Sequence, residues 1–217
     1  VSCGSRIDWH RDYVSGYIWN PDTFYADIKI PYGEADIKAP WELSRFHHAL
    51  MLGQAYALTH NERYVQEFVV QISDWIDANP FGCGVNWASP MEVAIRACNW
   101  LTAFLYVKDS PSLTEAFLVT FVSSLYDHGV HIRANLEGTR YIRGNHYLAN
   151  IVGLLCISST YTNFSTSSQW NSFAKKELIQ AMNKQVYGDG CDFEASTYYH
   201  CFVLEFFLYA TRLAVES

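Results

Sequence analysis

The feature that most limits the fold of this chain is a helical period of apolar residues from about residue 41 nearly to the end. Apolar side chains recur every three to four residues, and no stretch alternates as a half-buried strand would. The pattern predicts helices at residues 41–58, 62–78, 90–107, 113–136, 145–161, 168–187 and 196–215. Residues 1–40, which carry turn-forming Pro, Gly, Asn and Asp, are expected to form an irregular N-terminal wrapping segment.

The expected helices are spaced as repeated helical hairpins. Alternate helices begin near residues 41, 90, 144 and 196, at intervals of roughly 50 residues, without sequence identity between the repeats. Alternate helices in a hairpin array run parallel, so their N-termini meet on one rim. We therefore predict an all-α domain of antiparallel helix pairs over residues 41–217.

Two helix starts carry capping signals. In "SPME", Ser89 stands at the N-cap position, Pro90 at the first helical position and Glu92 where it closes a capping box. In "SLTE", Ser112 and Glu115 repeat the box. Both sequences predict that a serine side chain satisfies the first free backbone N–H groups.

Polar and aromatic residues gather where the alternate helices begin. They are Trp41, Glu42 and Arg45 in the first, Asn86, Trp87 and Glu92 around the third, Asn145 and His146 in the fifth, and Tyr198, Tyr199 and His200 in the seventh. Helix N-termini present free N–H groups and the positive end of the helix dipole, which favour an anion. The spacing thus predicts one polar rim suited to an anionic ligand.

Composition narrows the class of ligand. The chain has 15 Tyr, 13 Phe and 7 Trp, more than its core needs, so some are free to line a groove for sugars. The net charge is −7 and no run of Lys or Arg is present, which argues against nucleic-acid binding. No apolar stretch reaches the roughly 18 residues of a membrane span.

The six cysteines are Cys3, Cys83, Cys98, Cys156, Cys191 and Cys201, and none forms a CxxC pair. Cys98 and Cys156 lie on apolar helical faces, where each is interpreted as a small buried hydrophobic residue. A zinc site is therefore not expected, and no metal or other cofactor is predicted.

Five ordered stretches resemble the heparinase II/III and alginate lyase superfamily of polysaccharide lyases. They are "IDWHRD" with "SGYIW", "DIKAPWELSRFHHALMLGQAYALT", "WIDANPFGCGVNWASPMEVAIRACNWL", "RGNHYLAN" and "DGCDFEASTYYH". The resemblance implies an incomplete (α/α) toroid, followed in family members by a β-sandwich that adds a histidine to the cleft. This chain begins with Val and breaks off inside a helical pattern, so we expect it to be a fragment truncated before that sandwich.

The resemblance also assigns catalytic residues. The family's Asn-His element matches Asn145 and His146, and its catalytic tyrosine falls in "ASTYYH" at Tyr199, with Tyr198 as the alternative. Many relatives have Arg-Ser-Pro after the glutamate, where this chain has "AST" at 195–197. A basic side chain found in those relatives is therefore missing here.

The chemistry implied by the resemblance is β-elimination from a 4-linked uronic acid, which needs neither metal nor redox cofactor. The C5 proton becomes acidic once the adjacent carboxylate is neutralised, and Asn145 with His146 or an arginine can do this. Tyr199 can then transfer protons at C5 and at the departing O4. The expected partner is an acidic polysaccharide or oligosaccharide.

Further residues are expected to bind substrate. They are Arg143 in the loop before a helix, Arg45, Glu92 and Arg96 as subsite contacts, Trp87 as a stacking platform or core residue, and Tyr198 and His200 beside the tyrosine. Arg140 lies close to Arg143 in the same loop and is a similar candidate. Trp41, like Trp87, is either a stacking platform or a core residue. Glu194 is expected to brace its loop, while His47, His48, His128 and His131 are interpreted as structural or surface residues.

Two other functions remain open from the sequence. A toroidal glycoside hydrolase would need two carboxylic acids, for which Glu42, Glu92 and Glu194 are available. A noncatalytic glycan-binding protein of surface-polysaccharide synthesis is the third possibility. The compartment, whether bacterial periplasm or cytoplasm, is also open.

Overall fold

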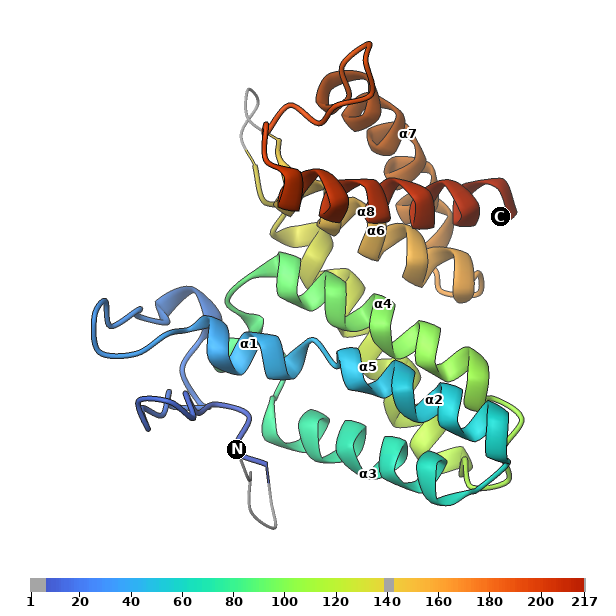
Figure 1. Ribbon diagram of the computed structural model, residues 1–217. Coiled ribbons are helices and arrows are strands. Elements are labelled where there is room, and N and C mark those ends of the chain that lie inside the picture. The colour runs from blue at the N-terminus through green and yellow to red at the C-terminus, as the bar shows by residue number, and fades with distance from the viewer. Residues whose placement is uncertain (1–6, 139–142, 217) are drawn as a thin grey trace.

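The computed structural model describes residues 7–138 and 143–216, and it is built from helices (Figure 1). The α-helices are α1 Lys38–Ser44, α2 His47–Thr59, α3 Arg63–Ala78, α4 Pro90–Val107, α5 Glu115–Ala134, α6 Asn145–Thr160, α7 Ser167–Gln185 and α8 Thr197–Glu216, and the 3-10 helices are η1 Tyr25–Asp27 and η2 Val85–Trp87. Within the described ranges the extended backbone pairs only in isolated bridges. The all-α prediction is confirmed.

The helices form two layers of opposite direction. Helices α2, α4, α6 and α8 run parallel and side by side, and the helices that connect them run in the opposite direction, with α3 packed on α2, α5 on α4 and α6, and α7 on α6 (Figure 1). The helix α4 packs against both α2 and α6, and α6 packs in turn against α8. The predicted hairpin array is therefore present, with the N-termini of α2, α4, α6 and α8 at one end. In the described part of the chain, no helix is both long and apolar enough for a membrane span.

The predicted helix at 41–58 is divided in two. Phe46 has a left-handed backbone (φ 59°) and separates α1 from α2. Its ring is 1 % exposed and stacks on Trp9 with 5.1 Å between ring centroids. The break frees the carbonyl of Arg45, which accepts a hydrogen bond from Asn99 Nδ2 at 2.8 Å. Phenylalanine rarely adopts this conformation, so the sequence carries no local signal for the break.

Ser89 and Pro90 occupy the predicted N-cap and first helical positions of α4, but neither Ser89 nor Ser112 makes the predicted side-chain capping bond. The side chain of Ser89 makes no capping bond to α4; instead Glu137 Oε2 accepts from the backbone N–H of Met91 at 2.7 Å. The helix α5 begins at Glu115, where Thr114 Oγ1 accepts from the N–H of Phe117 at 3.2 Å. A carboxylate from a distant loop competes better for α4 than the local serine, because charge-assisted hydrogen bonds are stronger.

Residues 7–37 are irregular and attach to the end of α3. Trp9 Nε1 donates to Asp74 Oδ2 at 2.8 Å, and a ring nitrogen of His10 bonds the carbonyl of Ala78 at 2.9 Å. Asn86, in η2, donates to the carbonyl of Trp9 at 2.8 Å. These bonds fix the chain that enters α1 against the loop that enters α4.

The core around α4 contains a buried cation. Arg96 is fully buried, its guanidinium lies 4.0 Å from the centroid of the Trp75 ring, and its Nε bonds His128 Nε2 at 2.9 Å. Burial lowers the pKa of Arg96 to about 9. Burial, and secondly the charge of Arg96, also lowers the pKa of His128 well below its usual value and that of His131 to about 4. Both imidazoles are therefore neutral in the native protein.

We expect these histidines to make the fold acid-sensitive. Because burial depresses the pKa of His131 from its ordinary value of 6.5 to about 4, the unfolded chain binds a proton in this window that the native state does not. Stability is complete above pH 6.5 and falls as the pH drops towards 4, by at most about 1.4 kcal/mol per pH unit for each such histidine. Urea unfolding at a series of pH values measures this slope.

Matched variants separate His131 from the other titrating groups. His131→Gln is expected to flatten the pH dependence of the unfolding free energy between pH 6.5 and 4, whatever its effect at pH 7. His60→Asn, at the exposed C-terminal end of α2, should leave the slope unchanged. An unchanged slope in His131→Gln would show that this imidazole does not carry the effect.

Candidate functional site

The rim formed by the N-termini of the parallel helices is joined by carboxylates. Glu92 on α4 binds Arg45 at the α1–α2 junction through both oxygens, at 2.6 and 2.7 Å. Glu137, before α6, bonds both α4 and α6, and Glu194, before α8, bonds Asn145 on α6. Each neighbouring pair of parallel helices is thus tied at its start by one acidic side chain. We call Glu92, Glu137 and Glu194 the rim carboxylates.

Asn145 is the first residue of α6 and is held by Glu194. Its backbone N–H donates to Glu194 Oε1 at 3.0 Å, and its Nδ2 lies 2.9 Å from each Glu194 oxygen. A Cβ atom at Gly144 would lie 2.9 Å from Glu194 Oε1, so the glycine makes room for the carboxylate. Glu194 therefore caps α6 with a negative charge at the positive end of its dipole, and the bracing role predicted for it is confirmed.

The geometry of this contact leaves part of the amide available. The two N–H bonds of an amide group diverge, so they cannot both point at the closely spaced oxygens of one carboxylate. One N–H of Asn145 is therefore shared between the Glu194 oxygens as a three-centre bond. The second N–H is then not committed to Glu194.

His146 is held by Glu137. Its Nδ1 lies 3.0 Å from Glu137 Oε1, and the imidazole is half-exposed. This hydrogen bond raises the pKa of His146 above its usual value. Because a carboxylate can only accept, Nδ1 carries a proton, and Nε2 is left to face solvent or substrate.

Glu137 is the residue that sequence reasoning missed. Besides His146 and Met91, it bonds Asn150, which donates from Nδ2 at 3.2 Å and accepts the Glu137 backbone N–H on Oδ1 at 2.7 Å. Burial opposes ionisation of Glu137, but the hydrogen bonds from His146, Asn150 and Met91 outweigh it and hold its pKa below the usual value. The sequence signal is a single acid in a loop, nine residues before His146, and no motif marks it.

The two candidate tyrosines begin α8. Tyr198 is 75 % exposed and Tyr199 is 42 % exposed, and their rings meet edge to face at 5.7 Å. Tyr198 lies within electrostatic reach of Arg45, so the first turn of α8 faces the α1–α2 junction. Both phenols are exposed at the start of α8, the parallel helix that packs against α6.

Asp192 holds the turn that precedes α8. Ala195 has a left-handed backbone (φ 53°), and its N–H donates to the carbonyl of Asp192 at 3.2 Å. The N–H of Glu194 donates to Asp192 Oδ2 at 3.0 Å. Asp192 thus sets the turn that aims Glu194 at Asn145.

A cavity of about 250 Å³ lies below the rim. Its walls come from all four parallel helices. They include His47, Cys98, Asn99, Thr102, Phe202, Glu205 and Tyr209. A cleft bounded on several sides by the parallel helices is what a toroid would provide for a bound chain of sugars.

Arg143 faces away from the other candidates. Its guanidinium pairs with Glu177 on α7 and lies over the Tyr147 ring at 4.6 Å from the centroid. Tyr147 donates to the same carboxylate at 2.6 Å. Arg143 is therefore already paired with α7, and Arg140 lies outside the described residues.

Trp87 and Arg96 belong to the core rather than to the rim. Trp87 is 2 % exposed and donates from Nε1 to the carbonyl of Asn79 at 3.2 Å. Arg96 is enclosed by Trp75 and His128 as described above. The apolar surroundings that bury both side chains prevent contact with a sugar, so we leave both out of the proposed site.

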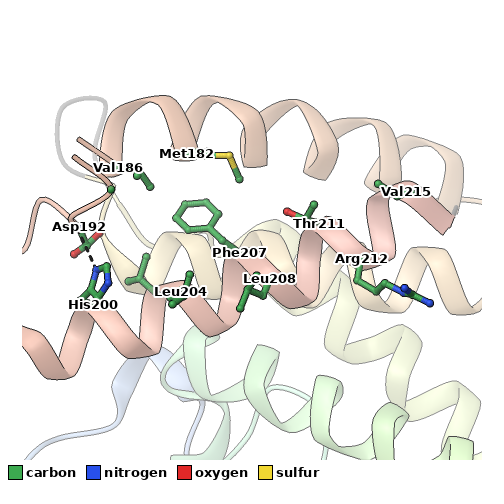
Figure 2. A pocket seen from close by; sticks show the side chains of 12 residues that line it. Met182, Val186, Asp192, His200, Leu204, Phe207, Leu208, Thr211, Arg212 and Val215 are labelled. Atoms are coloured by element: carbon green, nitrogen blue, oxygen red, sulfur yellow. Dashed lines mark hydrogen bonds between the residues drawn. The ribbon is translucent and has the colours of Figure 1, made fainter. Parts of the chain in front are cut away.

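His200 lies in a groove between α7 and α8 (Figure 2). Its Nδ1 accepts from the backbone N–H of Asp192 at 3.3 Å, at one end of the groove. The rest of the groove, whose volume is about 540 Å³, is lined by apolar side chains from both helices, among them Met182, Leu204 and Phe207. The structure thus couples His200 to the turn that holds Glu194, and it does not place the imidazole among the rim residues.

Comparison with known proteins agrees with this architecture. The chain is 32 % identical over 181 residues to a heparin-sulfate lyase of Pedobacter heparinus, covering 81 % of the chain and 27 % of that protein. A heparin-sulfate lyase of Bacteroides stercoris is 26 % identical over 226 residues, with 94 % and 33 % covered. The chain therefore spans about a third or less of the length of these relatives.

Solved structures give the same result. The crystal structure of a heparan sulfate lyase from Pedobacter heparinus superposes with a TM-score of 0.71 at 27 % identity, covering 92 % of this chain and 31 % of that one. A heparinase III structure superposes with a TM-score of 0.74 at 20 % identity, which supports the fold. The family model described as Heparinase II/III N-terminus matches residues 1–217. The chain belongs to the heparinase II/III N-terminal family.

Proposed function

We propose that this chain supplies the helical part of the active site of a polysaccharide lyase that cleaves a uronic-acid glycan by β-elimination. The observation that carries the proposal is the arrangement of Asn145, His146 and Tyr199 at the starts of α6 and α8, with the first two fixed by carboxylates. Relatives named heparin-sulfate lyases make a glycan of the heparan sulfate class the first substrate to test.

Neutralisation of the substrate carboxylate is assigned to Asn145 and His146. The free N–H of Asn145 donates to one carboxylate oxygen, and protonated His146 donates from Nε2 to the other. Glu137 keeps that proton on the imidazole towards neutral pH. Donors that are already fixed before substrate arrives stabilise the negative charge that develops as the C5 proton leaves.

Proton transfer is assigned to Tyr199. Its phenolate oxygen takes the proton from C5, the C4–O4 bond breaks, and the electron pair forms a C4–C5 double bond. The phenol then returns the proton to the departing O4 oxygen. Arg45 lies within electrostatic reach of Tyr198 in the first turn of α8, so a positive charge stands near the phenol proposed to transfer the proton.

The hydrolase alternative is weakened by the way the acids are used. Both oxygens of Glu92 bind Arg45, and both oxygens of Glu194 contact Asn145. A hydrolase needs one carboxylic acid that protonates the glycosidic oxygen and one carboxylate facing the sugar. The rim instead uses its carboxylates to position an amide, an imidazole and a guanidinium, which are donors for an anion.

The first prediction tests the tyrosine in the full-length protein acting on heparan sulfate. Tyr199→Phe removes only the hydroxyl of a partly exposed side chain, so folding should be retained while turnover falls by about 10²–10⁴-fold. Ultraviolet absorbance of the new C4–C5 double bond gives the rate. Tyr198→Phe, next to it on the same turn, is the matched control and should keep most of the activity.

Each other outcome has a definite meaning. Full activity in Tyr199→Phe with loss in Tyr198→Phe would move the role to Tyr198. Products without the double bond would replace the lyase by a hydrolase.

The second prediction concerns Glu137 as a positioning residue. Glu137→Gln keeps a carbonyl acceptor for the N–H of Met91 but removes the charge that raises the pKa of His146. The pKa of His146, followed by NMR of its ring proton, should therefore fall towards 6.5, and the alkaline limb of the kcat/KM profile should move with it. A purely structural role would lower activity equally at every pH and leave both midpoints in place.

A further inference from the structure

Two cysteines that the sequence analysis treated as small core residues meet between α4 and α6. The side chains of Cys98 and Cys156 are close enough for each thiol to shift the pKa of the other. Both residues are free cysteines. They lie 58 positions apart in the sequence, and the proposed lyase chemistry uses neither of them.

The helix packing explains why the two side chains meet. A Cβ atom on Gly153 of α6 would lie 2.7 Å from Cβ and 3.0 Å from Cα of Ala94 on α4, so the two backbones nearly touch there. Cys98 follows Ala94 by four residues, and Cys156 follows Gly153 by three. Because the helices run parallel, both cysteines lie about one turn further along the same close contact. A disulfide needs such an approach, since its Cα atoms are about 4.4–6.8 Å apart.

The polar groups around the pair distinguish the two sulfur atoms. Cys156 Sγ is also hydrogen-bonded to the Tyr209 hydroxyl at 3.3 Å, and that hydroxyl bonds Thr102 Oγ1 at 3.1 Å. Interaction with the partner thiol, together with burial, raises the pKa of Cys98, while interaction with Cys98 and the hydrogen bond with Tyr209 lower the pKa of Cys156.

Access to the pair is one-sided. Cys98 is half-buried and lines the cavity of about 250 Å³ below the rim. Cys156 is 1 % exposed and lies behind it. A small oxidant in the cavity therefore reaches Cys98 first.

We propose that Cys98 and Cys156 are a redox pair that closes to a disulfide between α4 and α6 when a small peroxide enters the cavity. The Cys98 sulfur attacks one peroxide oxygen, the O–O bond breaks, and water leaves with the thiol proton, giving a sulfenic acid at Cys98. The Cys156 sulfur then attacks the Cys98 sulfur, and the S–O bond breaks with loss of a second water. Two thiols lose two electrons, which reduce one hydrogen peroxide to two waters.

The disulfide would fasten together the two helices whose starts carry Glu92, Asn145 and His146. Because it closes a loop of more than 50 residues, it should stabilise the native state. The expected increase in Tm on oxidation is roughly 5–15 °C for a protein of this size. Dithiothreitol should reverse it.

The test treats the purified protein with hydrogen peroxide, blocks remaining thiols, and identifies peptides by mass spectrometry. We expect a peptide pair joined through Cys98 and Cys156, together with the rise in Tm. A Cys191→Ser/Cys201→Ser variant, which removes two exposed thiols, should keep both results. In Cys156→Ala the joined pair is lost, and dimedone should trap the sulfenic acid at Cys98.

Two results would overturn the proposal. One is recovery of Cys98 and Cys156 as separately blocked thiols after peroxide has oxidised the exposed cysteines. The other is a joined pair that forms equally fast after urea unfolding, because this would show that native packing does not direct the reaction.

Discussion

The attraction between carboxylates and the starts of parallel helices organises this molecule. Parallel helices place the positive ends of their dipoles and their free N–H groups at one end, where they repel one another unless negative charge is supplied. Glu137 and Glu194 supply it, each from a loop rather than from the helix it caps. Each carboxylate accepts a backbone N–H with one oxygen and also holds the side chain of His146 or Asn145. Helix capping and site geometry are therefore one set of contacts.

The helical array could be predicted from sequence because its cause is local. Each helix must bury one apolar face, so the period and spacing appear directly in the order of residues, and α4 was located at its observed bounds. The break at Phe46 could not be predicted, since burial against Trp9 overrides the backbone preference of phenylalanine. Tertiary packing decides that conformation, and no neighbouring residue announces it.

The candidate site divides in the same way. Asn145, His146 and Tyr199 are proposed from short motifs, because a reacting group must be of a particular chemical type. Glu137 was not predicted, because in the sequence an acid that acts through long-range hydrogen bonds looks like any other acid in a loop. Trp87 and Arg96 were placed at the rim by sequence position alone, whereas their side chains turn into the core. Sequence position gives the end of a helix, but side-chain direction depends on its neighbours in space.

The contact between Gly144 and Glu194 constrains how these two positions can evolve. Its missing side chain is the space that Glu194 occupies, so the two positions, 50 residues apart, form a single steric unit. A side chain at Gly144 would displace the Glu194 carboxylate, so selection would no longer retain the acid. If the acid were lost, the space at Gly144 would no longer be needed. Homologues should therefore retain or exchange the two positions together. Homologues in which both positions have changed would be those in which a carboxylate at this position no longer holds Asn145.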